Sequence, residues 1–230
     1  KNQEKLKPEK ADLLIIGVPE DRNSGFPGSA TAPDEIRKHL YNLNRINARF
    51  KVLDLGNLKI GNTANDSYFA LRDICDHFLE NHQKICVLGG SQDLTYGMTK
   101  AFDGRLFNMV TVDPKLDYRK GVKNIHSENY MNLIFEKQKN LYSYTAIAYQ
   151  NYFVDQTDID FFNHWHWDMK RLGQIRYDLT SVEPILRDAN VFSFDINAIR
   201  YMDAPGQAMA SPNGLYSEEA CQIARYAGIS

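Results

Sequence analysis

Short apolar runs rich in aliphatic and β-branched residues alternate along this chain with longer segments in which apolar residues recur at helical spacing. The apolar runs predict strands at 13–18, 52–55, 85–88, 109–112, 145–148 and 191–196. The helical spacing predicts helices at 33–43, 68–79, 94–102, 129–135, 158–165, 182–186 and 218–227. Apolar runs without polar alternation are typical of parallel strands that helices cover on both faces. The order of elements indicates an α/β protein of right-handed βαβ units, and by itself leaves a (β/α)8 barrel open.

Composition and charge narrow the class of protein. Of the 230 residues, 43% are hydrophobic and 24% are charged, and the formal net charge is −2. These values are typical of a globular protein, so we expect one domain at 11–230 after a polar, Lys-rich segment at 1–10. The lack of a basic footprint argues against nucleic acid or an anionic membrane as a partner. No apolar run reaches the length of a membrane span and segment 1–10 has no signal-peptide core, so we expect a cytoplasmic protein.

Carboxylates stand at the ends of two apolar runs, where an α/β sheet usually forms its active site. Asp113 and Asp117 follow the run at 109–112, and Asp195 lies near the end of the run at 191–196. Several oxygen ligands that converge from separate elements could hold divalent cations. Lys115 and Asn197, however, occupy places where further ligands would be needed. Because an ammonium has three donors and no acceptor, the pattern predicts a metal site whose metal has been partly replaced.

Four segments, in the same order along the chain, resemble the arginase, agmatinase and formiminoglutamase family, the ureohydrolases. Segments 17–21 and 27–37 are similar to the opening strand, loop and Ala-Pro-x-x-Ile-Arg helix start of that family. Leu-Gly-Gly-Ser-Gln-Asp at 88–93 resembles Leu-Gly-Gly-Asp-His-Ser, and Val-Asp-Pro-Lys-Leu-Asp at 112–117 resembles Asp-Ala-His-x-Asp. Ser-Phe-Asp-Ile-Asn at 193–197, with Ala-Pro-Gly at 204–206 and segment 212–220, resembles the closing motifs. The resemblance implies a three-layer α/β/α fold with an open, mainly parallel sheet, not a barrel.

The resemblance also implies positions for two Mn ions and a bridging hydroxide as nucleophile. The first ion would lie among Gln92, Asp113, Asp117 and Asp195. The second would need Lys115 and Asn197 beside the shared aspartates, and the Lys115 ammonium would repel a dication by several kcal/mol at an effective dielectric of about 20. We therefore expect either no metal or a single Mn, Mg or Ca ion at the first position, and Lys115 neutralising the aspartates. His126 matches only loosely the position of a family active-site histidine.

Three hypotheses of function follow from these residues. The leading one is a ureohydrolase-fold protein that has lost binuclear-Mn hydrolysis and serves as a scaffold, a partner subunit in a homo-oligomer or with another protein, or a sensor of an unidentified small molecule. The alternative is an active hydrolase of a linear amidine C–N bond, similar to formiminoglutamase, that uses one metal ion or a Lys-assisted water. The third is a module that binds a small molecule in the cleft without turning it over.

Two further expectations concern the surroundings of the site. The loops at 20–32 and 197–213 follow strand ends, so we expect both to arch over the carboxyl edge of the sheet. The resemblance implies a final strand after the helix at 218–227, inserted between the strands at 85–88 and 191–196. We therefore expect the 230 residues to be part of a longer chain. The two histidines at 164 and 166 and the Gly-Gly pair at 89–90 are interpreted as packing and turn residues rather than ligands.

Overall fold

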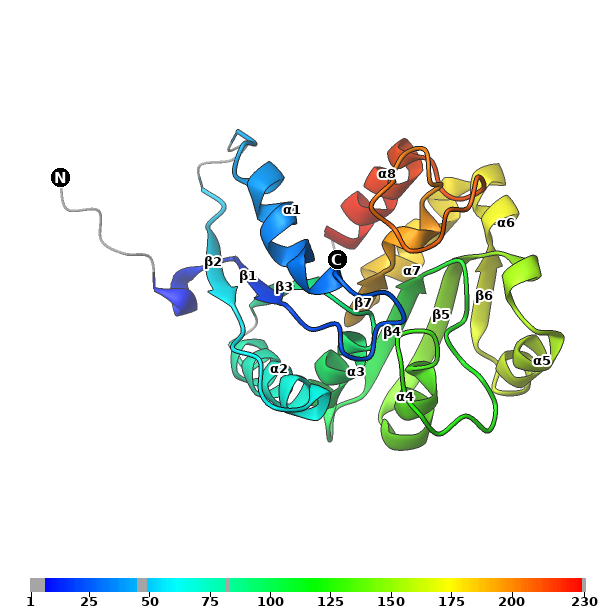
Figure 1. The fold of residues 1–230 in the computed structure, drawn as a ribbon, viewed down its shortest axis with the longest axis horizontal. Coiled ribbons are helices and arrows are strands. Elements are labelled where there is room, and N and C mark those ends of the chain that lie inside the picture. Colours follow the sequence, from blue (N-terminus) through cyan, green and yellow to red (C-terminus); the bar gives the residue numbers. More distant parts are fainter. Residues whose placement is uncertain (1–6, 45–48, 82, 229–230) are drawn as a thin grey trace. The chain divides into compact units, whose positions relative to one another are not determined.

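The computed structural model describes residues 7–44, 49–81 and 83–228, so residues 1–6 of the expected polar segment lie outside the described residues. Contacts divide the chain into two compact units, residues 1–101 and 102–230 (Figure 1), and each is described by itself. The expectation of one domain over 11–230 stays a prediction.

The first unit contains a parallel sheet of strand order β2-β1-β3. Its strands are β1 (Leu13–Val18), β2 (Val52–Asn57) and β3 (Lys84–Gly89), and its helices are α1 (Ala32–Leu40), α2 (Ala64–Leu79) and α3 (Leu94–Thr99). Short 3-10 turns lie at Pro8–Lys10, Ser29–Thr31 and Lys100–Phe102. Helix α1 covers one face of this sheet, and α2 and α3 cover the other (Figure 1). Helix α2 begins with a capping box, in which Thr63 and Asp66 each accept a hydrogen bond from the other's backbone N–H.

The second unit contains a parallel sheet of strand order β6-β5-β4-β7. Its strands are β4 (Phe107–Val112), β5 (Leu141–Tyr149), β6 (Asp168–Arg171) and β7 (Val191–Phe194). Its helices are α4 (Met131–Lys137), α5 (Gln156–His164), α6 (Leu172–Tyr177), α7 (Glu183–Arg187) and α8 (Ser217–Gly228), with 3-10 turns at Asn151–Phe153, Leu179–Val182 and Ile196–Ala198. Helices α4 and α5 lie on one face and α6, α7 and α8 on the other (Figure 1), which gives three layers.

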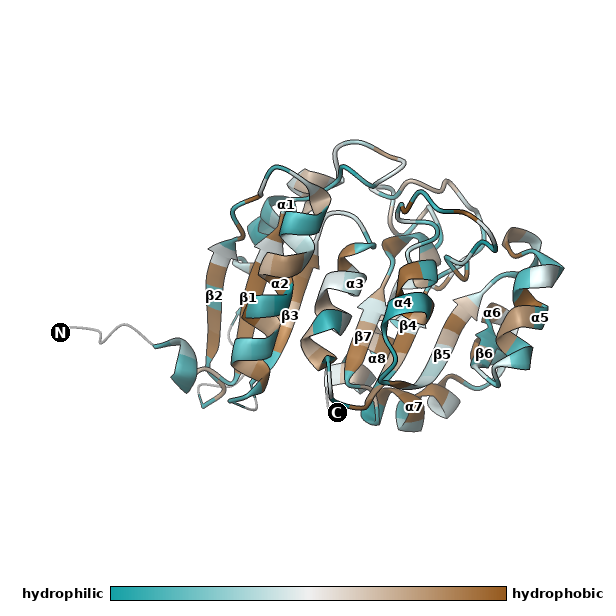
Figure 2. Cartoon of the chain, turned by 90° about the horizontal axis from the view of Figure 1, so that it is seen from below, coloured by the Kyte–Doolittle hydropathy of each residue, from teal (hydrophilic) through white to brown (hydrophobic). Residues whose placement is uncertain are grey.

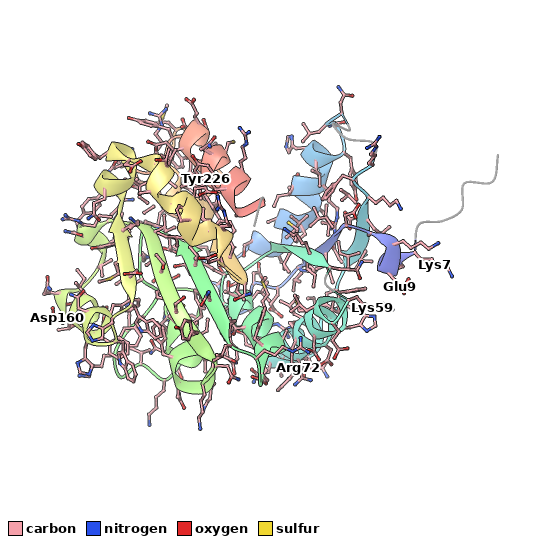
Figure 3. All side chains as sticks on the ribbon, turned by 180° about the vertical axis from the view of Figure 1, so that it is seen from behind. Lys7, Glu9, Lys59, Arg72, Asp160 and Tyr226 are labelled. Atoms are coloured by element: carbon pink, nitrogen blue, oxygen red, sulfur yellow. The ribbon has the colours of Figure 1, made fainter. Side chains whose placement is uncertain are left out.

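The core of the second unit lies on both faces of its sheet. Aliphatic side chains from β4, β5 and helices α6 to α8 fill one face, among them Val112, Ile147, Ile175, Leu186 and Ile223. On the other face, rings from α4, α5, β5 and the residue before β6 contact one another edge-on or stacked, namely Phe135, Tyr144, Phe161, Phe162 and Trp167. Figure 2 shows mostly apolar strands, except the polar edge strand β6, and polar outer helix faces. Side chains such as Arg72 on α2 and Asp160 on α5 point away from the sheets of their own units (Figure 3).

The structure confirms the predicted α/β class, with every strand pair among the described residues parallel. Both sheets are open, which excludes the barrel left open by the alternation of elements. The prediction missed β6 and α6, because β6 is a polar edge strand of four residues and α6 has only six. Among the described residues, β3 pairs only with β1 and β7 only with β4. The expected closing strand stays a prediction.

Candidate functional site

The candidate site lies in the second unit, at the carboxyl end of β4. Asp113 directly follows this strand, its backbone N–H donates to the Ile147 carbonyl of β5 at 3.0 Å, and its carboxylate Oδ1 accepts from the Lys115 backbone N–H at 2.7 Å. Asp117 closes the turn with a positive φ of 47°, a conformation that aspartate tolerates better than most side chains. Its carbonyl accepts from the Met131 N–H at the start of α4. The turn from 113 to 117 is thus tied both to the sheet and to α4.

The side chain of Lys115 forms an ion pair that the sequence did not predict. Its ammonium contacts the carboxylate of Glu128, which also lies 3.6 Å from the Arg119 guanidinium. The predicted position of Lys115 is among the aspartates, and in the structure its backbone N–H donates a hydrogen bond to the Asp113 carboxylate. The side chains of Lys115 and Glu128 are 22% and 30% exposed, so the pair is only partly screened by water.

Asp195 and Asn197 enter the site from the neighbouring strand β7. The Asp195 backbone N–H donates to the Val112 carbonyl at the end of β4, which brings the two strand ends together. Its Oδ1 accepts from the Asn197 N–H at 2.7 Å and caps the 3-10 turn Ile196–Ala198. The Asn197 side-chain oxygen accepts from the Met209 N–H at 2.9 Å, so it anchors the loop that follows.

Burial and neighbouring charges shift the pKa values of Asp117, Asp195 and Glu128. Burial raises the pKa of Asp117 well above its ordinary value, and the charges of Asp113 and Asp195 raise it further, against a lowering effect of Lys115. Burial likewise raises the pKa of Asp195, whereas the pKa of Glu128 is lowered on balance, burial raising it and Lys115 outweighing that effect. The pKa of Asp117 and that of Asp195 are thus raised, whereas that of Glu128 beside the Lys115 ammonium is lowered.

Two buried tyrosines lie beneath the aspartates. The hydroxyl of Tyr144 on β5 forms a 2.7 Å hydrogen bond with the Thr111 hydroxyl, and the hydroxyl of Tyr130 pairs with Ser193. Burial is the main cause of the raised pKa of both phenols, and the charge of Asp117 adds to it. The groups buried next to the aspartates thus include two neutral phenol hydroxyl groups.

A cavity of about 590 Å³ opens beside this cluster. Lys115, Asp117 and Glu128 line it together with residues of the segments 116–122 and 152–158. The lining contains side chains of both charges. Arg119 and Lys120 are basic, and Asp155 and Asp158 are acidic. A cavity of this volume is large enough for a small organic ligand.

Of the remaining residues singled out in the sequence, His126 lies near Glu128, and the others lie in the first unit or at the end of α5. His126 lies in the same turn as Glu128, whose backbone N–H donates to its Nδ1 at 3.2 Å. Gln92 belongs to the first unit, follows the turn after β3, and its side-chain nitrogen and oxygen are buried without a hydrogen-bond partner among the described residues. The pair Gly89 and Gly90 makes a tight turn, as interpreted, because a Cβ on Gly90 would lie 2.3 Å from the Glu20 carbonyl oxygen. His164 ends α5 and stacks edge-on against Trp165.

The residues present do not fit a binuclear metal centre. At the positions implied for a second ion, Lys115 offers only donors and the Asn197 oxygen is engaged by Met209. Over residues 7–44, 49–81 and 83–228, no three His, Cys, Asp or Glu side chains are grouped so as to hold a metal ion. A single ion at Gln92, Asp113, Asp117 and Asp195 stays a prediction.

None of the helices in the described ranges has the length and apolarity of a membrane span.

The parallel sheets and the aspartates at the strand ends define an arginase-like α/β protein. Residues 11–229 match the arginase family, and the chain belongs to that family. Formimidoylglutamases of Salmonella paratyphi C and Citrobacter koseri are 34% and 31% identical to it over 104 and 119 residues. These matches span 43% and 49% of this chain but only 33% and 38% of the relatives, so the matched region is about a third of the curated proteins.

Solved structures show the same fold. Trypanosoma cruzi formiminoglutamase with Mn²⁺ superposes with a TM-score of 0.84 at 23% identity, over 94% of this chain and 80% of the other. Formimidoylglutamase from Bacillus subtilis superposes with a TM-score of 0.81 at 18% identity, over 94% of this chain and 74% of the other. The predicted ureohydrolase fold and family are confirmed.

Proposed function

We propose that this chain binds the cationic end of a linear amidine, such as a formimino compound, and hydrolyses its C–N bond without a binuclear metal centre. The observation that carries the proposal is the opening of Asp117, Lys115 and Glu128 into one cavity, at the strand end that holds Asp113. The relatives named formimidoylglutamase support the choice of substrate class. We further propose a cytoplasmic location and self-association or a protein partner.

An amidinium group matches the polar groups of the site. It is planar, cationic and rich in N–H donors, and carboxylates accept such donors in pairs. Asp117 is one of the carboxyl groups that line the cavity, together with Glu128, Asp155 and Asp158. Glu128 neutralises the Lys115 ammonium, which would otherwise repel a cationic ligand.

The hydrolysis balances with water as the only co-reactant. The water oxygen adds to the amidine carbon while a site carboxylate takes its proton, which is general-base catalysis. The C–N bond then breaks and the departing nitrogen takes that proton. The second water proton passes from the hydroxyl group to the released amine, so that the products are an ammonium and an amide. The Lys115 ammonium, held by Glu128, donates a hydrogen bond to the oxygen that becomes the amide carbonyl.

A second candidate function is a protein without hydrolytic activity, retained as a scaffold, partner subunit or ligand sensor. The ion pair of Lys115 with Glu128 favours it, because an internal cation stabilises the aspartates without a ligand or metal. The Asn197 side-chain oxygen favours the same candidate, because it already accepts a hydrogen bond from the Met209 N–H and so needs no metal ion or ligand. This candidate predicts no turnover.

Turnover of formiminoglutamate, agmatine and arginine distinguishes the two functions. We expect release of an amine from at least one compound, reduced about 100-fold or more in Asp113→Ala. Asp160→Ala is the matched control, because Asp160 is exposed on α5 and accepts a hydrogen bond from the Gln156 side chain on the same helix. Absence of turnover with a ligand-dependent rise in Tm that Asp113→Ala removes would instead establish a sensor. Two equivalents of bound Mn per chain would contradict both candidates as stated.

A further inference from the structure

A second cavity, of about 600 Å³, lies in the second unit at the carboxyl ends of the neighbouring strands β5 and β6. Tyr149 and Arg171, which end these strands, are partners in the strand register. Helix α6 and Asn213 complete the wall, and Tyr152 lines this cavity as well as the first one. The carboxyl ends of parallel strands are where α/β sheets commonly bind ligands.

The lining of this second cavity is basic. It contains Arg171 and Arg176 and no aspartate or glutamate. Arg176 is already engaged, since its guanidinium donates to the Asn213 side chain and the Gly214 carbonyl and stacks on the Tyr216 ring. Arg171 forms no ion pair with any of the described residues. The cavity therefore offers one uncompensated positive charge.

A buried amide adds an unused donor to this charge. Gln150 is 3% exposed, and its Nε2 has no hydrogen-bond partner among the described residues. Its Oε1 accepts from the Tyr152 hydroxyl and from the Asn213 amide, which fixes the amide orientation with the nitrogen as the free end. Because a buried donor without a partner costs about 1 to 3 kcal/mol, an acceptor supplied by a ligand would stabilise it.

We propose that this cavity binds a small carboxylic acid with an apolar body. The carboxylate pairs with the Arg171 guanidinium and accepts from Gln150 Nε2, while Tyr149, Leu172 and Tyr177 contact the apolar body. A phosphate dianion fits less well, because only one cation in the lining is uncompensated. The site is separate from the amidine chemistry, so its failure would leave that proposal unaffected.

Isothermal titration with benzoate, benzamide and inorganic phosphate tests the proposal on the full chain. We expect benzoate to bind at least about tenfold more tightly than the neutral benzamide or phosphate. Arg171→Ala should weaken benzoate about tenfold and leave Tm unchanged, because Arg171 is exposed. Arg187→Ala, which removes an exposed arginine of α7 outside the cavity, is the matched control and should bind benzoate as the unaltered chain does.

Gln150→Leu provides an independent arm that removes the amide without removing charge. It should weaken benzoate severalfold, and if this variant does not fold, the Arg171→Ala result decides alone. Equal binding of benzamide and benzoate, or an Arg171→Ala variant that binds benzoate normally, would overturn the proposal. Phosphate binding as tight as benzoate would overturn the assignment to a carboxylic acid.

Discussion

Glu20 should stabilise the first unit in a way that disappears in acid. Its side chain is 1% exposed and accepts hydrogen bonds from the Arg22 side chain at 2.8 Å, the Arg22 backbone N–H at 3.1 Å and the Ser67 hydroxyl at 2.7 Å. Hydrogen bonding from Arg22, the largest cause, lowers the pKa of Glu20 from 4.5 to about 2. Glu20→Gln removes this charge at nearly constant size.

The size of the effect follows from the pKa difference. Lowering the pKa of Glu20 from 4.5 to about 2 corresponds to about 3 kcal/mol of folding stability when the carboxylate is ionised. Since the Arg22 side chain is 37% exposed, screening by water reduces the expected loss in Glu20→Gln to about 2 kcal/mol. Because the folded-state pKa is the lower one, the contribution is complete above about pH 4.5 and is lost as the pH falls toward about 2.

Urea unfolding followed by circular dichroism at several pH values measures this difference. We expect the gap between the two proteins to be constant from pH 7 to about pH 5 and to close below the ordinary glutamate pKa. Glu35→Gln is the control, because its carboxylate is 58% exposed and pairs with Lys38 on the same helix. A gap that does not change between pH 5 and pH 2.5, or a loss equal to that of Glu35→Gln, would refute the reasoning.

Two further predictions concern other parts of the two units. Gly90→Ala should lower the free energy of unfolding by about 1 to 3 kcal/mol, because its Cβ would meet the Glu20 carbonyl at 2.3 Å, and denaturant unfolding checks this. Gly173 has open space around it, so Gly173→Ala should leave the free energy of unfolding unchanged or raise it by up to about 1 kcal/mol. If Gly173→Ala lowered this free energy as much as Gly90→Ala does, the steric argument would be contradicted. Lys115→Met should cost about 1 to 2 kcal/mol in thermal or urea unfolding because it leaves a carboxylate cluster uncompensated, whereas Lys137→Met, on an exposed pair, should cost under about 0.5. Equal costs for the two lysine variants would show that the buried aspartates do not need the ammonium.

Much of the fold could be predicted from the sequence because burial on both faces leaves a direct pattern. Strand β1 is apolar from Leu13 to Val18 and its predicted bounds agree with the structure. Strand β6 carries no such pattern, since it is an edge strand whose terminal residues Asp168 and Arg171 are exposed. A strand that pairs on one side needs little apolar surface, so its position depends on β5 rather than on its own residues.

Part of the candidate site, too, could be predicted from the sequence, and part of it depends on the tertiary structure. The sequence by itself determined that Asp113, Asp117 and Asp195 follow buried strands, because a polar residue after an apolar run lies at the strand end. It also predicted that the Lys115 ammonium occupies the position of a metal ligand, which stays a prediction. Only the tertiary structure decided that the partner of Lys115 is Glu128, which lies in a turn without hydrophobic periodicity. Such ion pairs depend on how a loop returns to the strand end, and distance in space, not spacing along the chain, sets their Coulomb energy.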